Sequence, residues 1–354
     1  MTSKERVLAA IDHRVTDRVP ITFDAEKEVY EALSDHLALD SKEALFDRLH
    51  VDTWMILPKN FIYPEEEEGK EIKTSIWGYR TKVTRYSGGV YDELCFSPLA
   101  DKDEIEDIKV HAWPSDDALD FSHFPKVVES HKDRAIIGVF TWGAYFIATH
   151  VRGLENLMVD FALRKSYAHH LIGTIAEKSL IYLETMLDSY GEGIDIVFMA
   201  DDYCSQMAPL FSPAAFKEFV VPYLTKFVEI VHKHDKKFLL HVCGAVRPLL
   251  PMIIDAGVDA LEPIQVRAEG MEPEGLKRDF GNDIAFYGGM DLQQVLCHGT
   301  EEQVEREARR LIDVLGKDGG YVFGPGHTYI QVDAPLTNII RMYETAYAYR
   351  PWSF

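Results

Sequence analysis

Short runs of large apolar residues alternate with longer stretches in which apolar residues recur every three or four positions. The short runs have the length and β-branched content of strands that are buried on both faces. The longer stretches have the spacing of amphipathic helices. Because strands that alternate with helices pair in parallel through right-handed crossovers, this order predicts an α/β fold. The predicted strands lie at residues 17–24, 51–57, 135–140, 194–199, 238–242, 258–262, 284–287 and 321–323, and the long helices at residues 154–190, 213–234, 246–256, 273–280 and 301–315.

Eight such strands predict a closed (β/α)8 TIM barrel that forms one domain over residues 1–354. Thr2 and Glu5 form a capping-box pattern before an apolar run, which predicts a first helix. Further helical patterns follow at residues 25–37 and 41–49. Together these helices predict an N-terminal cap on the barrel.

Residues 65–99 interrupt the alternation of strands and helices. Residues 79–86 and 90–96 have the pattern of paired strands, and Gly88 and Gly89 separate them. The pattern predicts a β-hairpin insertion within the barrel domain.

Composition and charge narrow the range of partners. The chain is 47% hydrophobic and 12% aromatic, which indicates a globular protein with a large core. A formal net charge of −21 disfavours nucleic acid and anionic membranes as partners. No signal sequence or membrane-length apolar run is visible, and the four cysteines are too irregularly spaced for a disulfide framework. These features predict a cytoplasmic protein.

The residues at the strand ends carry the candidate chemistry, because TIM barrels hold their active sites at the carboxyl ends of the strands. His241 and Cys243 lie two residues apart at the end of the strand at 238–242, so their side chains point the same way. Imidazole and thiolate are zinc ligands, and a catalytic zinc takes about three protein ligands. His327 follows the glycine-rich turn at 324–326 and is the predicted third ligand. A general acid or a substrate hydrogen-bond donor is an equally good role for this histidine.

Three carboxylates are candidate catalytic groups. Asp202 follows the strand at 194–199, where capping of the next segment is the alternative role. Glu262 ends the strand beside the one that bears His241, and is either a weak fourth ligand or a partner that orients a ligand. Asp52 interrupts an otherwise apolar predicted strand, where a carboxylate requires a specific reason.

Aromatic and amide side chains near the same strand ends predict a substrate pocket. Its candidate members are Trp142, Tyr145, Tyr203, Gln206 and Tyr329. Flat apolar surfaces with a few polar groups favour a small aromatic or alkyl methyl compound over a polyanion. Packing of Trp142 beneath the N-terminal cap is the alternative.

The chain resembles the uroporphyrinogen decarboxylase superfamily. The resemblance lies in residues 2–10, 17–20, 216–223, 241–248 and 324–331, and extends over nearly the whole chain. It implies a single-domain (β/α)8 barrel. It also implies one of two activities, because the superfamily contains decarboxylases that need no cofactor and zinc methyltransferases that work with corrinoid proteins.

Several positions depart from the decarboxylase branch. Residues 21–28 contain no arginine, whereas that branch has an arginine-rich segment that clamps the carboxylates of its porphyrinogen. Thr149 occupies the position of the active-site tyrosine, and residues 204–206 replace a Ser-His element. Asp52 and His327 match decarboxylase positions, and Asp52 would there stabilise a protonated pyrrole intermediate.

The methyltransferase branch holds zinc with a His-x-Cys pair and a late cysteine. His241 and Cys243 match the pair, and His327 stands where the branch has the late cysteine. Two imidazoles and one thiolate suit zinc and leave the ion more Lewis acidic than two thiolates do.

These observations support three hypotheses. The leading one is a zinc-dependent methyltransferase that acts with a methylcorrinoid-carrying partner protein on a small methylated or methoxylated compound. The alternative is a cofactor-independent decarboxylase of uroporphyrinogen or a related acid. The third is a subunit that binds a corrinoid protein or ligand without catalysis.

Overall fold

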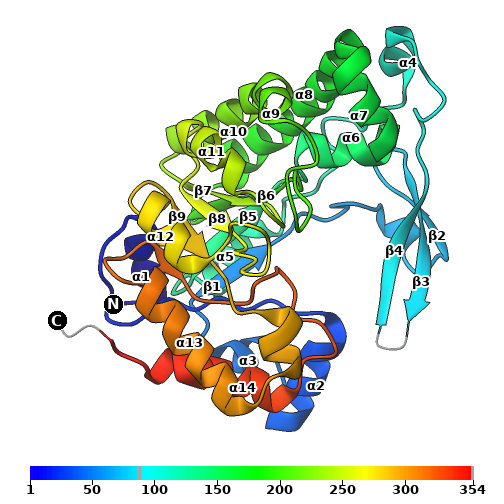
Figure 1. Cartoon of the computed structure of the whole chain (residues 1–354). Coiled ribbons are helices and arrows are strands. Elements are labelled where there is room, and N and C mark those ends of the chain that lie inside the picture. The colour runs from blue at the N-terminus through cyan, green and yellow to red at the C-terminus, as the bar shows by residue number, and fades with distance from the viewer. Residues whose placement is uncertain (87–88, 352–354) are drawn as a thin grey trace.

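A parallel sheet that curls into a barrel forms the centre of the computed structural model, which describes residues 1–86 and 89–351 (Figure 1). This confirms the predicted fold class. Within these residues seven strands pair in parallel in the order β1-β5-β6-β7-β8-β9-β10. Their bounds are Thr53–Ile56 for β1, Ala135–Val139 for β5, Ile196–Ala200 for β6, Lys237–His241 for β7, Ala260–Glu262 for β8, Ala285–Tyr287 for β9 and Tyr321–Val322 for β10.

The remaining predicted strand, at 17–24, takes the eighth position with only a single bridge, between Ile21 and Phe323. The N–H of Phe323 donates to the carbonyl of Pro20 (2.8 Å), and the N–H of Thr22 donates to the carbonyl of Phe323 (2.9 Å). On the other side the N–H of Asp52 donates to the carbonyl of Ile21 (2.7 Å). Backbone hydrogen bonds therefore join the last strand to the first and close the barrel.

Side chains alternate between the inside and the outside of the barrel, as the strand period requires. Ile196 and Phe198 of β6 belong to the inner apolar cluster, whereas Val197 packs outward into the cluster beneath the helices. Val7 and Ile11 of helix α1 (Ser3–Ile11) join the inner cluster, and this helix contacts β1, β5 and β10. Because α1 fills the amino end of the barrel, the carboxyl end is left for a site.

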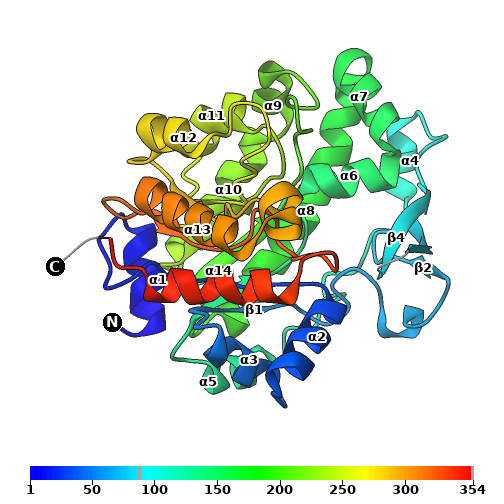
Figure 2. The same ribbon diagram turned by 60° about the horizontal axis from the view of Figure 1, so that its bottom comes forward.

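Helices surround the barrel (Figures 1 and 2), and some of the predicted ones are divided. The stretch at 213–234 breaks at Val220 because Pro222 lacks the N–H that a continuous helix needs there.

Within the described residues no helix combines the length and the apolar character needed to cross a bilayer. The other helices are α2 (Lys27–Leu37), α3 (Lys42–Arg48), α4 (Ile105–Val110), α5 (Phe124–Ser130), α6 (Ala144–Arg152), α7 (Leu154–Leu163), α8 (Lys165–Tyr190), α9 (Pro213–Phe219), α10 (Val221–Lys233), α11 (Leu250–Asp255), α12 (Pro273–Phe280), α13 (Glu301–Leu315) and α14 (Leu336–Ala348), with short turns η1 (Glu65–Glu67), η2 (Arg247–Leu249) and η3 (Leu292–Leu296).

The predicted hairpin is present as part of a small antiparallel sheet that lies to one side of the barrel (Figure 2). Strand β3 (Arg80–Tyr86) pairs with β4 (Gly89–Phe96), and the unpredicted strand β2 (Ile72–Thr74) pairs with β3. The part of the predicted turn at Gly88 lies outside the described residues.

Candidate active site

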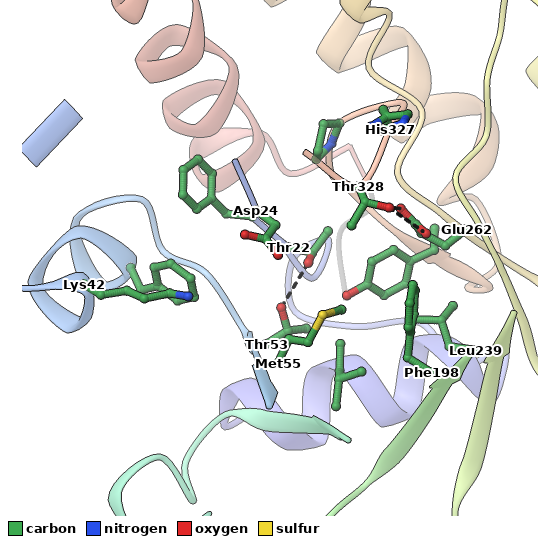
Figure 3. Close-up of a pocket in the computed structure, with 15 residues that line it drawn as sticks. Thr22, Asp24, Lys42, Thr53, Met55, Phe198, Leu239, Glu262, His327 and Thr328 are labelled. Carbon is green, nitrogen blue, oxygen red and sulfur yellow. Dashed lines mark hydrogen bonds between the residues drawn. The ribbon is translucent and has the colours of Figure 1, made fainter. Parts of the chain in front are cut away.

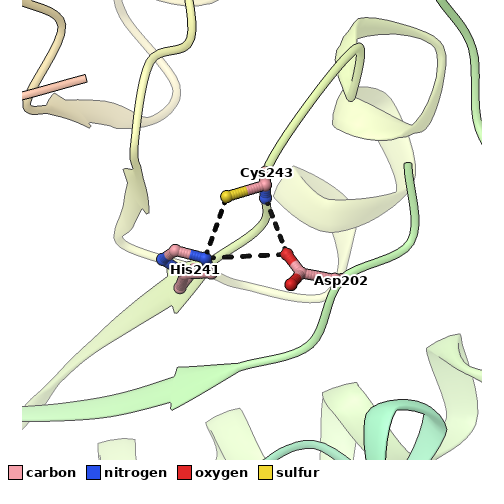
Figure 4. A group of neighbouring side chains, drawn as sticks. All are labelled: Asp202, His241 and Cys243. Atoms are coloured by element: carbon pink, nitrogen blue, oxygen red, sulfur yellow. Dashed lines mark hydrogen bonds and ion pairs between the residues drawn. The ribbon is translucent and has the colours of Figure 1, made fainter. Parts of the chain in front are cut away.

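Asp202, His241 and Cys243 come together at the carboxyl ends of β6 and β7 (Figure 4). Strand register pairs Ala200 with His241, so the residues after β6 lie level with those after β7. Sγ of Cys243 lies 3.3 Å from Nε2 of His241, and that nitrogen lies 3.6 Å from Oδ1 of Asp202. The backbone N–H of Cys243 donates to the same carboxylate oxygen at 3.0 Å. One nitrogen, one sulfur and one oxygen thus face a common point.

His241 is held in position by its other ring nitrogen. Nδ1 is hydrogen-bonded to the Glu262 carboxylate and lies 2.9 Å from the hydroxyl of Thr328. That hydroxyl also donates to Oε1 of Glu262 at 3.2 Å. Both His241 and Glu262 are buried. Glu262 therefore orients the imidazole so that Nε2 points toward Cys243 and Asp202, which is how outer partners fix metal-ligating histidines.

His327 lies next to the same cluster. Its ring centroid is 6.3 Å from that of His241, the two rings are nearly perpendicular, and its side chain is close enough to Cys243 for each to influence the pKa of the other. Nδ1 of His327 accepts the N–H of Tyr329 at 3.3 Å. The donor atoms that the structure brings within 4.8 Å of one another are those of Asp202, His241 and Cys243, whereas His327 lies beside this group and its role as a ligand stays a prediction.

The four side chains shift one another's protonation. Burial acts to lower the pKa of His241, but the negative charge of Glu262 outweighs it and raises that pKa well above its usual value. Burial alone would raise the pKa values of Cys243 and Asp202, but hydrogen bonds with the histidines lower both. The hydrogen bond with Cys243 raises the pKa of His327. The cluster favours a thiolate and a carboxylate beside a positive charge, which is the field that a bound cation also requires.

The donor set fits zinc in both type and spacing. Zinc takes imidazole, thiolate and carboxylate ligands at bond lengths of roughly 2.0–2.3 Å, so tetrahedral ligands lie about 3.3–3.8 Å apart. The separations of 3.3 Å and 3.6 Å across His241 fall in that range. Sequence reasoning proposed Asp202 as a catalytic group and missed it as a donor, because the contact depends on the register between β6 and β7.

The structure does not bring Asp52 to this site. Asp52 precedes β1 at the amino end of the barrel and is fully buried. Its Oδ1 pairs with Arg6 at 2.7 Å, its Oδ2 pairs with Arg18 at 2.6 Å, and Oδ2 also accepts the N–H of Ile21 at 2.8 Å. Two buried guanidinium groups account for the carboxylate in the apolar run, and they hold Asp52 apart from the cluster of Asp202, His241 and Cys243.

Tyr145 and Tyr203 also lie away from the barrel interior, which corrects their assignment to the substrate pocket. Both side chains are buried in the outer core behind β6, where their rings contact each other and Phe211. The Tyr203 hydroxyl donates to Oδ2 of the fully buried Asp201 at 2.9 Å. Both tyrosines support the loop after β6 rather than a ligand.

We expect Asp201→Asn to make the protein less sensitive to high pH. Burial raises the pKa of Asp201 to about 7, although hydrogen bonds from Phe146 and Tyr203 oppose this. Because the folded pKa exceeds the unfolded one, the stability due to the Asp201 proton is fully present below about pH 4 and is lost as pH rises through about 7. Asparagine carries no charge and accepts the same backbone hydrogen bond. Urea unfolding is measured with a chelator present. The free energy of unfolding of the variant should exceed that of the wild type by on the order of 1 kcal/mol or more at pH 8, and by less at pH 5.

Asp188→Asn is the control for this charge change, because Asp188 is an exposed residue on the surface of α8. If the difference in stability between Asp201→Asn and the wild type were the same at both pH values, Asp201 would not have a raised pKa in the folded protein.

Trp142 packs against the inner apolar cluster of the barrel, and Gln206 lies near His327. Trp142 follows β5 and packs edge-on against Phe61, with ring centroids 4.7 Å apart. The side-chain amide of Gln206 donates to Gln265 at 2.6 Å, and both glutamines line a cavity of about 220 Å³ that also reaches His327. Gln206 therefore lies at the wall of a cavity beside His327, and its role in substrate binding stays a prediction.

A second cavity enters the barrel beside Glu262 and His327 (Figure 3). Thr22, Asp24 and Lys42 line it, and the sequence reasoning did not select them. The alternation of the predicted strand at 17–24 was the available signal, because it puts Thr22 and Asp24 on one face. Tyr329 lies near this cavity, where burial and the carboxylates of Asp24 and Glu262 raise its pKa.

The fold and this cluster define the class of the protein: a parallel α/β barrel with a candidate metal centre at the carboxyl ends of its strands. Comparison with known families is consistent with that class. The chain belongs to the uroporphyrinogen decarboxylase (URO-D) family, whose sequence model matches residues 97–349.

Known relatives include both methyltransferases and decarboxylases. The chain is 26% identical over 184 residues to a methylated-thiol–coenzyme M methyltransferase of Methanosarcina mazei, an alignment that spans 51% of this chain and 47% of that one. It is 24% identical over 358 residues to the methylcobamide:CoM methyltransferase MtaA of Methanosarcina barkeri, with 96% and 95% of the two chains covered. A uroporphyrinogen decarboxylase of Syntrophotalea carbinolica is 23% identical over 193 residues, or 53% of this chain and 51% of the relative.

A solved structure described as a methyltransferase from Methanosarcina mazei has the same fold. It superposes with a TM-score of 0.69 at 21% identity and covers 98% of both chains.

Proposed function

We propose that this protein is a zinc-dependent methyltransferase that works with a corrinoid protein on a small methylated or methoxylated compound. The observation that carries the proposal is the convergence of Asp202, His241 and Cys243, with His327 beside them, at the mouth of the barrel. The full-length similarity to methylcobamide:CoM methyltransferases supports the corrinoid partner.

The donors that would hold zinc are His241, Cys243 and His327, with Asp202 as an alternative or additional ligand. A bound zinc ion would supply Lewis acidity, which favours the deprotonated form of a thiol or hydroxyl and polarises an ether oxygen. The chain's own contribution is preorganisation. Glu262 fixes the ring of His241, and the backbone N–H of Cys243 fixes the carboxylate of Asp202.

The decarboxylase alternative has less support. Its proposed electrostatic group, Asp52, is already paired with two arginines at the opposite end of the barrel. Lys42 is the one basic side chain, apart from His327, among the described residues that line the central cavity. A substrate with many carboxylates would find no arginine there to pair with.

The direct experiment measures metal and methyl transfer together. Protein purified without chelator should contain about one zinc per chain by plasma mass spectrometry. It should also transfer methyl groups between methylcobalamin or cob(I)alamin and a panel of thiols and methoxylated aromatics. Protein that takes up no zinc, or that transfers no methyl group with any compound tested, would contradict the proposal. Decarboxylation of uroporphyrinogen by the metal-free protein would establish the alternative.

Glu262→Gln is expected to weaken zinc binding by roughly 10- to 100-fold, because it removes the negative charge that orients His241 and makes it a better ligand. Competition with a chromogenic chelator measures the affinity. Glu272→Gln, on a carboxylate just before α12 and outside the cluster, is the matched control. Unchanged zinc affinity in Glu262→Gln would show that Glu262 does not support the metal site.

A further inference from the structure

The central cavity contains a group of hydroxyls that the proposed metal site does not use. The hydroxyls of Thr22 and Thr53 lie 3.0 Å apart and project toward the cavity (Figure 3). Tyr287, from the end of β9, lines the same space. Its side chain is 96% buried, and its hydroxyl interacts with those of Thr22 and Thr53 but makes no well-aligned hydrogen bond among the described residues. A buried hydroxyl without a well-aligned hydrogen bond is unfavourable, so its position in a cavity indicates that a ligand completes its hydrogen bonding.

Two carboxylates and two basic side chains, Lys42 and His327, line this cavity. Asp24 and Glu262 both line it, and neither carboxylate forms an ion pair with a lysine or arginine among the described residues. The Asp24 carboxylate accepts a hydrogen bond from Tyr30 at 2.8 Å. Burial raises the pKa of Asp24, and the more distant charge of Lys42 only partly opposes this. A positively charged or donating group placed beside Asp24 would relieve that cost.

The ammonium group of Lys42 does not neutralise these two carboxylates. Its side chain is exposed, and its ammonium lies over three aromatic rings, at 4.9 Å from Tyr30, 5.1 Å from Phe46 and 5.2 Å from Trp54. Cation–π contacts hold this charge on the outer side of the cavity. Among the described residues, a small anion inside the barrel would therefore face Asp24 and Glu262 with the imidazole of His327 nearby, but without a guanidinium or a second ammonium to pair with.

We infer that the cavity selects a small substrate whose far end is a hydrogen-bond donor, either an amine or a hydroxyl, and that it disfavours sulfonates, phosphates and carboxylates. Asp24 accepts from the donor group, and the hydroxyls of Thr22, Thr53 and Tyr287 surround it. The reacting end of the substrate then points toward Glu262 and His327, where the candidate metal centre lies. This orientation rests on the proposed function, whereas the preference for a donor group rests on the cavity alone.

Three two-carbon thiols test the preference, because they differ only in the far group. They are 2-aminoethanethiol, 2-mercaptoethanol and 2-mercaptoethanesulfonate. Ligand-observed NMR titration measures weak dissociation constants, and it is run on the full chain with and without added zinc. We expect the amine and the alcohol to bind at least about tenfold more tightly than the sulfonate, since a hydrogen bond to a charged group carries an effect of that size. Equal or tighter binding of the sulfonate, or no binding of any of the three, would overturn the inference.

Two substitutions assign the effect to residues. Asp24→Asn should weaken amine binding by about tenfold and remove most of the discrimination against the sulfonate. Glu28→Gln removes one negative charge from an exposed position on α2, outside the cavity. It should change neither the affinity for the amine nor the discrimination against the sulfonate. Tyr287→Phe should weaken binding of the amine and the alcohol without lowering the melting temperature, because no well-aligned internal hydrogen bond is lost.

An unchanged order of affinities in Asp24→Asn would also overturn the inference. Zinc content is measured on the same samples. A protein without zinc that still prefers the amine would reject the proposed metal chemistry and keep the cavity assignment.

Discussion

Replacing Cys243 with serine is expected to leave a folded protein that has lost its zinc and nearly all of its methyl-transfer activity. Serine preserves the size of the side chain, and the backbone N–H that donates to Asp202 is unaffected. The alcohol, however, stays protonated near neutral pH and is a poor ligand compared with a thiolate. The loss of zinc affinity should exceed about 100-fold, the upper end of the effect of an outer partner. Metal analysis after dialysis, with circular dichroism to check folding, measures both outcomes.

Cys95→Ser is the matched control, because Cys95 is an exposed free cysteine on β4. Full zinc retention by Cys243→Ser would exclude the thiolate from the metal site.

Substitutions at His327 separate metal binding from reactivity. His327→Cys should keep zinc but change the rate, because a second thiolate donates more charge and reduces the Lewis acidity of the ion. His327→Ala should lose most of both. His298→Ala, at an exposed histidine, should behave as the wild type. If His327→Ala kept the wild-type zinc affinity and rate, this histidine would belong to neither the metal site nor the chemistry.

The second large effect concerns stability. Asp52→Asn should destabilise the protein by about 3–5 kcal/mol, because it leaves two buried guanidinium groups without their shared counter-charge. Arg6 keeps Asp17 as a partner, at 2.6 Å, whereas Arg18 has Asp52 as its sole ion-pair partner within the described residues. Urea unfolding at neutral pH measures the change. Asp35→Asn, at an exposed carboxylate of α2, is the control.

The same variant also separates the two activities considered for this family. At temperatures where it stays folded, Asp52→Asn should retain zinc and methyl transfer, since the carboxylate lies at the far end of the barrel from Cys243. A variant of normal stability that had lost its activity would return Asp52 to a catalytic role.

Local patterns predicted the fold well where the pattern was complete. The predicted bounds of α12 and α13 agree with the structure, and the capping box at Thr2 is formed as expected. Predictions were less accurate where tertiary contacts decide the outcome. The segment around Ile21 forms one bridge instead of a full strand, and the predicted helix at 154–190 divides at Arg164.

The site was predictable to the extent that neighbouring residues determine it. The two-residue spacing of His241 and Cys243 placed both on one side of β7, as a strand requires. The contribution of Asp202 depends on the register of a different strand, and sequence spacing does not contain that information. Tyr203 follows the same strand as Asp202, yet its ring faces the outer core. Proximity to a strand end was therefore insufficient to define the pocket.

Closure of the barrel by Pro20, Thr22 and Phe323 has a consequence for biosynthesis. The two sides of that junction are about 300 residues apart in the chain, so the segment around Ile21 cannot find its partner until the segment that contains Phe323 has left the ribosome. The central cavity takes Thr22 from one side of the junction and Thr328 from the other. A nascent or truncated chain that ends before Phe323 therefore lacks both the closed ring and the cavity, and the binding proposed for that cavity is expected only once both sides of the junction have been synthesised.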